Sequence, residues 1–106
     1  NQKQRRSNWM DKHRIYTTGE KTSRWYKISI TSTKKKRILN LGKNTVSGGY
    51  KFTIYKKGKK KAIKTIKVTG NANAKIAKMP KKKGTYYIRI SKLTKKTNGT
   101  YEIGYY

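Results

Sequence analysis

The chain has 106 residues, and its 30 Lys and Arg against 3 Asp and Glu give a formal net charge of +27 at neutral pH. This length fits a single domain with a modest core. The absence of Cys and the single His exclude thiolate chemistry, a disulfide framework and a zinc site. The three carboxylates are too few for a calcium cage, a two-metal site or a glycosidase pair: Asp11, Glu20 and Glu102. We therefore expect no catalytic residues, no metal and no cofactor.

The composition favours a folded chain over a disordered polycation. Hydrophobic residues make up only 32% of the sequence, but 12 residues are Trp, Tyr or Phe, which can supply a thin core. No apolar run approaches the ~20 residues that a membrane span needs. The sequence begins without Met and without an apolar leader, which suggests either a trimmed mature chain or an expressed fragment and is compatible with secretion.

Residues 1–22 are polar and basic. The few apolar residues in this range follow no sustained period: Trp9, Met10, Ile15 and Tyr16. We expect a basic N-terminal arm or an irregular first strand here, followed by a single domain over residues 23–106.

From Ser23 onward, short segments rich in Ile, Tyr, Thr and Val alternate with clusters of Gly, Asn and Lys. This rhythm is typical of an all-β sandwich or barrel. Seven strands are predicted, at residues 25–30, 37–41, 50–55, 63–68, 74–77, 86–90 and 101–105. No segment combines a helix cap with a helical period. The predicted fold is all-β: a small antiparallel β-sandwich, jelly-roll or Greek-key-like, of about seven strands with a basic N-terminal arm.

The alternation of side chains along these strands predicts which of them enter the core. Those assigned to it include Tyr26, Ile28, Ile30, Tyr50, Phe52, Ile54, Tyr86 and Tyr101. In residues 63–68 the spacing of Ile63, Ile66 and Val68 does not alternate, so a single strand there needs a bulge or a change of face.

The basic residues gather in alternate connections between the predicted strands. If each strand crosses the domain once, antiparallel to its sequence neighbour, consecutive loops fall at alternating ends. The first, third and fifth loops carry twelve basic residues, whereas the second, fourth and sixth carry only Lys43, Lys95 and Lys96. We expect the twelve to converge on one end of the domain and to bind a polyanion there. They are Lys34, Lys35, Lys36, Arg37, Lys56, Lys57, Lys59, Lys60, Lys61, Lys81, Lys82 and Lys83.

A surface of this composition would select its ligand by charge density. Lysine is a point charge, whereas bidentate recognition of phosphates or base edges favours Arg. The alternative is that the lysine-rich loops are solvated turns and that lysines on exposed strands prevent edge pairing.

Several aromatic residues lie among the lysines, and aromatic rings in a basic setting can bind single-stranded nucleic acid or sugar rings. Tyr55, Tyr87 and Tyr106 are candidates for such a role. Trp9 is either an interfacial anchor or a staple that fixes the N-terminal arm to the sandwich. Glu102 is expected to pair with a basic residue on a neighbouring strand.

Four stretches contain Tyr and Ile, and the last three of them begin with Gly: WYKI at 25–28, GYKFTIYKKGK at 49–59, GTYYIRI at 84–90 and GTYEI at 99–103. In this order, residues 23–106 resemble the bacterial pre-peptidase C-terminal domain, a small β-sandwich attached to extracellular proteases and other exported proteins. The resemblance implies a sandwich fold, export and a non-catalytic role in targeting or adhesion. The family is generally rich in acidic residues and some members bind calcium near the start of the domain. Residues 1–22 offer only two acids, so calcium binding is not expected and the charge implies a different ligand.

These observations predict a secreted or cell-surface, non-enzymatic, cationic β-sandwich. Its partner would be an anionic polymer or surface, such as cell-wall teichoic acid, an acidic glycan or nucleic acid. One alternative is an antimicrobial or bacteriocin-like protein that acts on anionic lipid head groups. Another is a nucleic-acid-binding protein. Repulsion between like charges favours a monomer at low salt.

Overall fold

The computed structural model describes residues 8–17, 24–44, 48–69 and 74–106 of the chain. Within these ranges it contains nine strands and no helix. The strands are β1 (Asn8–Trp9), β2 (Arg14–Thr17), β3 (Trp25–Ile30), β4 (Ile38–Asn44), β5 (Gly49–Lys56), β6 (Ala62–Thr69), β7 (Ala74–Lys78), β8 (Gly84–Lys92) and β9 (Thr100–Tyr105).

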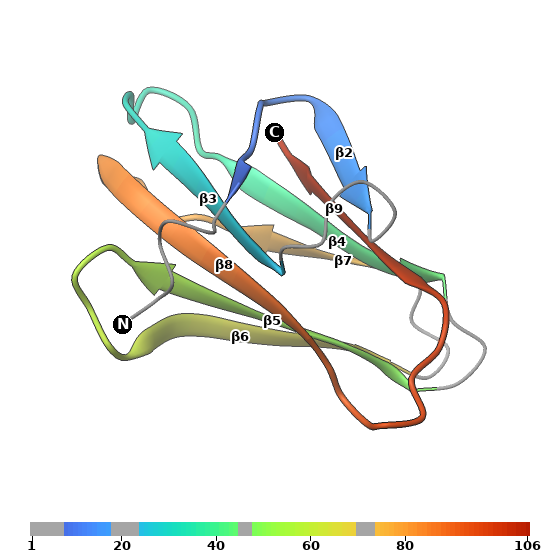
Figure 1. Cartoon of the computed structure of the whole chain (residues 1–106). Helices are drawn as coiled ribbons and strands as arrows, with labels where there is room; N and C mark the ends of the chain where they lie inside the picture. Colours follow the sequence, from blue (N-terminus) through green and yellow to red (C-terminus); the bar gives the residue numbers. More distant parts are fainter. Residues whose placement is uncertain (1–7, 18–23, 45–47, 70–73) are drawn as a thin grey trace.

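The strands form two sheets that pack face to face (Figure 1). One sheet has five strands in the order β1-β3-β8-β5-β6, and the other has four in the order β2-β9-β4-β7. Neighbouring strands are antiparallel except β1 and β3, which are parallel. The predicted antiparallel all-β sandwich is confirmed, and the seven predicted strands correspond to β3 through β9.

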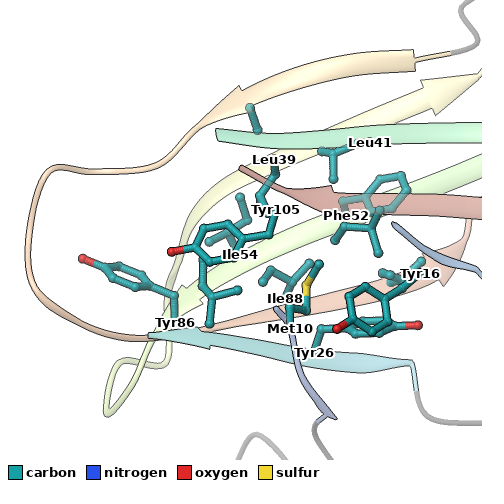
Figure 2. Close-up of a cluster of buried hydrophobic side chains, with 14 of the residues drawn as sticks. Met10, Tyr16, Tyr26, Leu39, Leu41, Phe52, Ile54, Tyr86, Ile88 and Tyr105 are labelled. Atoms are coloured by element: carbon teal, nitrogen blue, oxygen red, sulfur yellow. The ribbon is translucent and has the colours of Figure 1, made fainter. Parts of the chain in front are cut away.

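The core lies between the sheets and follows from alternation along each strand. In β3, Tyr26, Ile28 and Ile30 are buried, whereas Lys27 and Ser29 point to the other side of the sheet. The same alternation in β5 and β8 adds two further rows of large apolar side chains. Side chains from both sheets meet in this layer (Figure 2). Removal of this apolar area from water is the main force that holds the sandwich together.

Tyrosine supplies much of the core. Tyr26 and Tyr101 are 0% and 2% exposed, and their hydroxyl groups form a hydrogen bond of 2.7 Å. The hydroxyl of Tyr50 donates to the main-chain oxygen of Gly99 at 3.2 Å. A buried polar group without a hydrogen-bond partner lowers the stability of the fold by about 1–3 kcal/mol. These hydrogen bonds remove that cost, so large phenol rings can be buried inside the sandwich. The predicted burial of Tyr26, Tyr50, Tyr86 and Tyr101 is confirmed.

Residues 8–17 contribute to both sheets. β1 extends the five-stranded sheet beside β3, and β2 extends the four-stranded sheet beside β9. Met10 and Tyr16 are buried in the core between them. These residues lie in the range predicted as a basic arm or an irregular first strand, and the structure shows them as two short strands with buried side chains. Residues 1–7 and 18–22 of that range lie outside the described residues.

The irregular spacing in residues 63–68 corresponds to a bulge, as expected. Ile54 of β5 pairs with Lys64 of β6, but the next residue, Tyr55, pairs with Ala62. Ile63 is therefore an extra residue on the bulged strand, and its side chain is 44% exposed. The bulge thus places an apolar side chain on the surface at one end of the sandwich.

The other end is held by a buried threonine in the connection between β8 and β9. Thr97 is 3% exposed. Its hydroxyl oxygen accepts from the amide of Gly49 at 3.1 Å and from the amide of Thr94 at 3.3 Å, and its hydroxyl donates to the oxygen of Gly49 at 3.1 Å. A Cβ atom on Gly48 would lie 2.2 Å from this hydroxyl, so only glycine fits there. The hydrogen bonds of Thr97 therefore fix the 93–99 segment to the start of β5.

We expect Thr97→Val to lower the free energy of unfolding by about 1–3 kcal/mol, because it leaves the buried Gly49 amide without its acceptor while keeping the side-chain volume. Urea denaturation followed by circular dichroism measures this change. Thr65→Val, on the exposed face of β6, is the control, with an expected change within about 0.5 kcal/mol. Equal effects of the two substitutions would show that the Thr97 hydroxyl does not hold this end.

Candidate anion-binding surface

Three connections lie at the same end of the sandwich, on the left in Figure 1: residues 31–37, 57–61 and 79–83. They meet because β3 and β5 both run antiparallel to β8, so both strands end where β8 begins. A main-chain hydrogen bond of 2.9 Å from the amide of Met79 to the oxygen of Arg37 joins the first connection to the third. We call these three connections the basic end.

All twelve residues predicted to bind a polyanion lie in or directly beside the basic end. Ten of them are exposed, and Arg37 and Lys56 are half-buried. The loops thus alternate between the two ends of the sandwich in the way that the sequence predicts. Whether these side chains bind an anion stays a prediction.

The connection between β5 and β6 is a tight turn that carries four lysines. Gly58 has a φ of +84°, in the left-handed region that favours glycine. The amide of Lys59 donates to the oxygen of Lys56 at 3.0 Å and closes the turn. The amide of Lys57 donates to the oxygen of Thr85 at 2.9 Å, which fixes the turn against β8. The lysines therefore project from a backbone that is held in place.

The connection between β7 and β8 is held by side chains of the neighbouring strands. The phenol of Tyr86 donates to the oxygen of Lys82 at 2.9 Å. Burial raises the pKa of the Tyr86 hydroxyl, so this group stays protonated and remains a donor at neutral pH. The Nζ atom of Lys64 donates to the oxygen of Lys78 at 2.8 Å, where the connection leaves β7.

Two open hollows adjoin at the basic end, since Ile63 and Pro80 line both of them. The larger has a volume of about 530 Å³ and includes Tyr86, and the smaller has about 330 Å³ and reaches down to Ile54 and Met79. The floor is therefore apolar. The rim is cationic, with Lys36, Lys64 and Lys78 at the smaller hollow and Lys56, Lys59, Lys61 and Lys82 at the larger.

No acidic side chain lines either hollow among the described residues. The two described carboxylates lie elsewhere, Asp11 after β1 and Glu102 in β9. The described lining thus brings several ammonium groups together with no carboxylate among them. Such a surface attracts anions over a distance comparable to the Debye length, about 8–10 Å at physiological salt.

The sequence did not single out Lys64 and Lys78, although both reach the rim. They lie in β6 and β7, so they were outside the loops that the alternation argument considered. The irregular spacing around Ile63 is the signal that could have found Lys64, because a bulge re-aims the side chains on either side of it.

The opposite end of the sandwich is less basic. Of the predicted lysines there, Lys95 and Lys96 are exposed in the connection between β8 and β9, and Lys43 is half-buried in β4. The loops of this end that fall at residues 45–47 and 70–73 lie outside the described residues.

The prediction that Glu102 pairs with a basic residue on a neighbouring strand is wrong. The residues directly opposite Glu102 are Thr17 on β2 and Gly42 on β4, and neither is basic. The side chain is exposed, so solvent can stabilise the carboxylate without an ion pair.

The described residues contain no group of three or more His, Asp or Glu side chains that could hold a metal ion. In the same ranges no helix is long and apolar enough to cross a membrane.

Comparisons with known proteins bear on the fold. A scan against protein-family models found no match, and neither did a search of the curated proteins. Among solved structures, the chain is similar to the pre-peptidase C-terminal domain of a collagenase from Bacillus anthracis. The TM-score is 0.70, the sequence identity is 17%, and the match covers 94% of each chain. The resemblance seen in the sequence is thus confirmed at the level of architecture: the chain adopts the β-sandwich fold of pre-peptidase C-terminal domains.

Proposed function

We propose that this protein is an exported, non-enzymatic domain that binds an anionic polymer or surface through its basic end. The observation that carries the proposal is the convergence of three separate lysine-rich connections around hollows that no described carboxylate lines. Lysines retained only to keep the chain in solution would not need to gather at one end.

A polymer fits this end better than a small anion does. The basic residues extend over three connections, so a ligand with repeated phosphate, sulfate or carboxylate groups can contact several lysines at once. Each such contact releases counterions from the polymer, and this release supplies most of the free energy of binding. Teichoic acid, an acidic glycan and nucleic acid share this chemistry.

Export and the absence of catalysis rest on other observations. The solved structure of similar fold is the pre-peptidase C-terminal domain of a collagenase, and the resemblance to that family is what supports export. The described residues of this chain offer two carboxylates in different parts of the fold and no cluster that could activate water or a nucleophile. Both observations support a role in attachment for the sandwich.

The first test replaces Lys59, Lys60, Lys82 and Lys83 with Gln. Binding to heparin and duplex DNA is measured by fluorescence anisotropy across a salt series. We expect the slope of log K against log salt on DNA to become shallower by about 0.9 for each phosphate contact that is lost. At about 0.1 M salt we expect at least about a tenfold loss of affinity.

The matched control removes the same number of charges from the other end, by Gln at Lys43, Lys92, Lys95 and Lys96. Both variants have the same net charge, so a general charge effect would weaken binding equally in the two. An equal loss, or an unchanged slope in the first variant, would contradict the proposal.

Salt should stabilise the folded protein, because the native state concentrates positive charges that the unfolded chain spreads apart. We expect the melting temperature to rise between about 0.01 M and 0.15 M NaCl, as the Debye length falls from about 30 Å to about 8 Å. The variant with Gln at the basic end should start from a higher melting temperature and gain less. Thermal circular dichroism measures both, and a melting temperature that falls with salt would contradict this account.

Action on anionic membranes is a second candidate function, favoured by the exposed Ile63 between lysines on the floor of the basic end. If the basic end docks on lipid, Ile63→Ser should weaken binding to phosphatidylglycerol vesicles by about fivefold, the effect of losing a partly buried aliphatic side chain. Ile76→Ser, at a 65% exposed site on β7, is the control. Vesicle sedimentation and dye leakage measure the effect, and the same result for both variants would count against membrane docking.

A further inference from the structure

The outer face of the five-stranded sheet carries aromatic side chains where a lysine-rich chain would be expected to carry polar ones. Alternation directs Trp25 and Lys27 of β3 and Tyr55 of β5 away from the core. It does the same for Tyr87 and Arg89 of β8. These strands are neighbours in the sheet, so the outward side chains lie next to each other.

The register places these side chains in two adjacent rows. Lys27 is opposite Tyr87, which is opposite Tyr55. Trp25 is opposite Arg89 in the next row. Parallel pairing of β1 then brings Trp9 opposite Lys27. We call the outward surface formed by Trp9, Trp25, Tyr55 and Tyr87 the aromatic face.

Three rings of the aromatic face contact another ring or a cation. The ring centres of Trp25 and Tyr55 are 5.8 Å apart, with 33° between the planes. The guanidinium carbon of Arg89 lies 5.8 Å from the ring centre of Trp25. The Nζ atom of Lys27 lies 4.5 Å from the ring centre of Trp9. Two of the four rings of the aromatic face therefore have a cationic group beside them.

The aromatic face is ordered by packing and still accessible. Tyr87 is only 3% exposed although it points away from the core, so its outward neighbours bury it. Trp9 is 54% exposed, and Trp25 and Tyr55 are half-buried. Rings held on a rigid sheet lose little conformational entropy when a flat ligand stacks on them.

We propose that the aromatic face binds single-stranded nucleic acid by base stacking. Every base has a flat π-face that can stack on Trp or Tyr, and Lys27 and Arg89 lie within the same surface to meet the phosphates. A duplex keeps its bases stacked inside and presents no free face. A neutral glycan can stack on the rings but gains nothing from the cations. This site is separate from the basic end and does not rest on the function proposed there.

The decisive comparison uses two oligomers of equal charge. One is a thymidine oligonucleotide of about twelve residues, and the other is an abasic deoxyribose-phosphate chain of the same length. Pure charge attraction binds both equally, whereas stacking favours the first by at least about fivefold per stacked base. Both tryptophans of the chain, Trp9 and Trp25, lie on the aromatic face. Their fluorescence should therefore be quenched by the thymidine oligomer and not by the abasic one.

Variants then locate the site. Trp9→Ala and Tyr55→Ala should each reduce the preference for thymidine over abasic chains by about fivefold or more, and Trp9→Phe should retain most of it. Ile15→Ala, at a 50% exposed position on β2 of the other sheet, should leave the preference unchanged. Circular dichroism confirms that each variant is folded, and the comparison of the two oligomers on the unmodified protein does not depend on any variant.

Equal affinity for the two oligomers without a difference in quenching would overturn the proposal. The proposal would also be overturned if a neutral oligosaccharide bound more tightly than the thymidine oligomer and quenched the tryptophan fluorescence. That result would show that the aromatic face binds sugar rings. The function proposed for the basic end fails on a different result, an unchanged salt slope for heparin after the Lys to Gln substitutions. The two proposals can therefore fail independently.

Discussion

The two-residue period of the strands is the constraint on which the rest of this structure depends. Successive side chains point to opposite faces, so one strand such as β5 supplies Phe52 and Ile54 to the core and Tyr55 to the outer surface. Because neighbouring strands run antiparallel, connections alternate between the two ends of the sandwich. Core, outer face and basic end are thus consequences of one pattern.

A core built within this pattern has to stabilise a chain of net charge +27 with few aliphatic residues. Tyrosine meets that demand because each ring buries a large apolar area and its hydroxyl can find a polar partner. The hydrogen bond between Tyr26 and Tyr101 lies inside the core, while Tyr50 and Tyr86 direct their hydroxyls to main-chain oxygens of connections. The same side chains therefore fill the interior and fix the loops at both ends.

The sequence was sufficient for the strands from β3 to β9, because each is a short segment rich in apolar residues that is bounded by Gly, Asn or Lys, and β3, β5 and β8 also alternate clearly. It was also sufficient for the bulge at Ile63, whose spacing breaks the period. The position of the basic loops at one end could be predicted, because the end at which a loop lies depends only on the number of strands before it and on their alternating directions. Within each sheet, the pairing of the described strands gives the alternating directions that this prediction requires from β3 to β9.

The sequence was insufficient where pairing partners decide the structure. β1 and β2 have two and four residues, too few to show a period, and they form because β3 and β9 offer free edges. The pairing of Trp9 with Lys27 follows from that parallel contact and could not be read from either residue. The aromatic face was therefore visible in the sequence only as separate aromatic residues. Glu102 was misjudged for the same reason, since its neighbours depend on register.

The fold is shared with a domain of only 17% sequence identity, so the fold itself does not specify the function. The function depends on the residues at the surface. In this chain the inward side chains specify the sandwich. The residue types at outward positions and in the loops can vary without changing the fold. β5 connects the two surfaces that this chain has developed: Tyr55 belongs to the aromatic face, and the next residue, Lys56, lines the larger hollow of the basic end. Consecutive residues of a strand point to opposite sides, so a polymer that contacted both would have to turn around the end of the sheet. Flexible single strands can make that turn, whereas a stiff duplex cannot follow it over so short a distance.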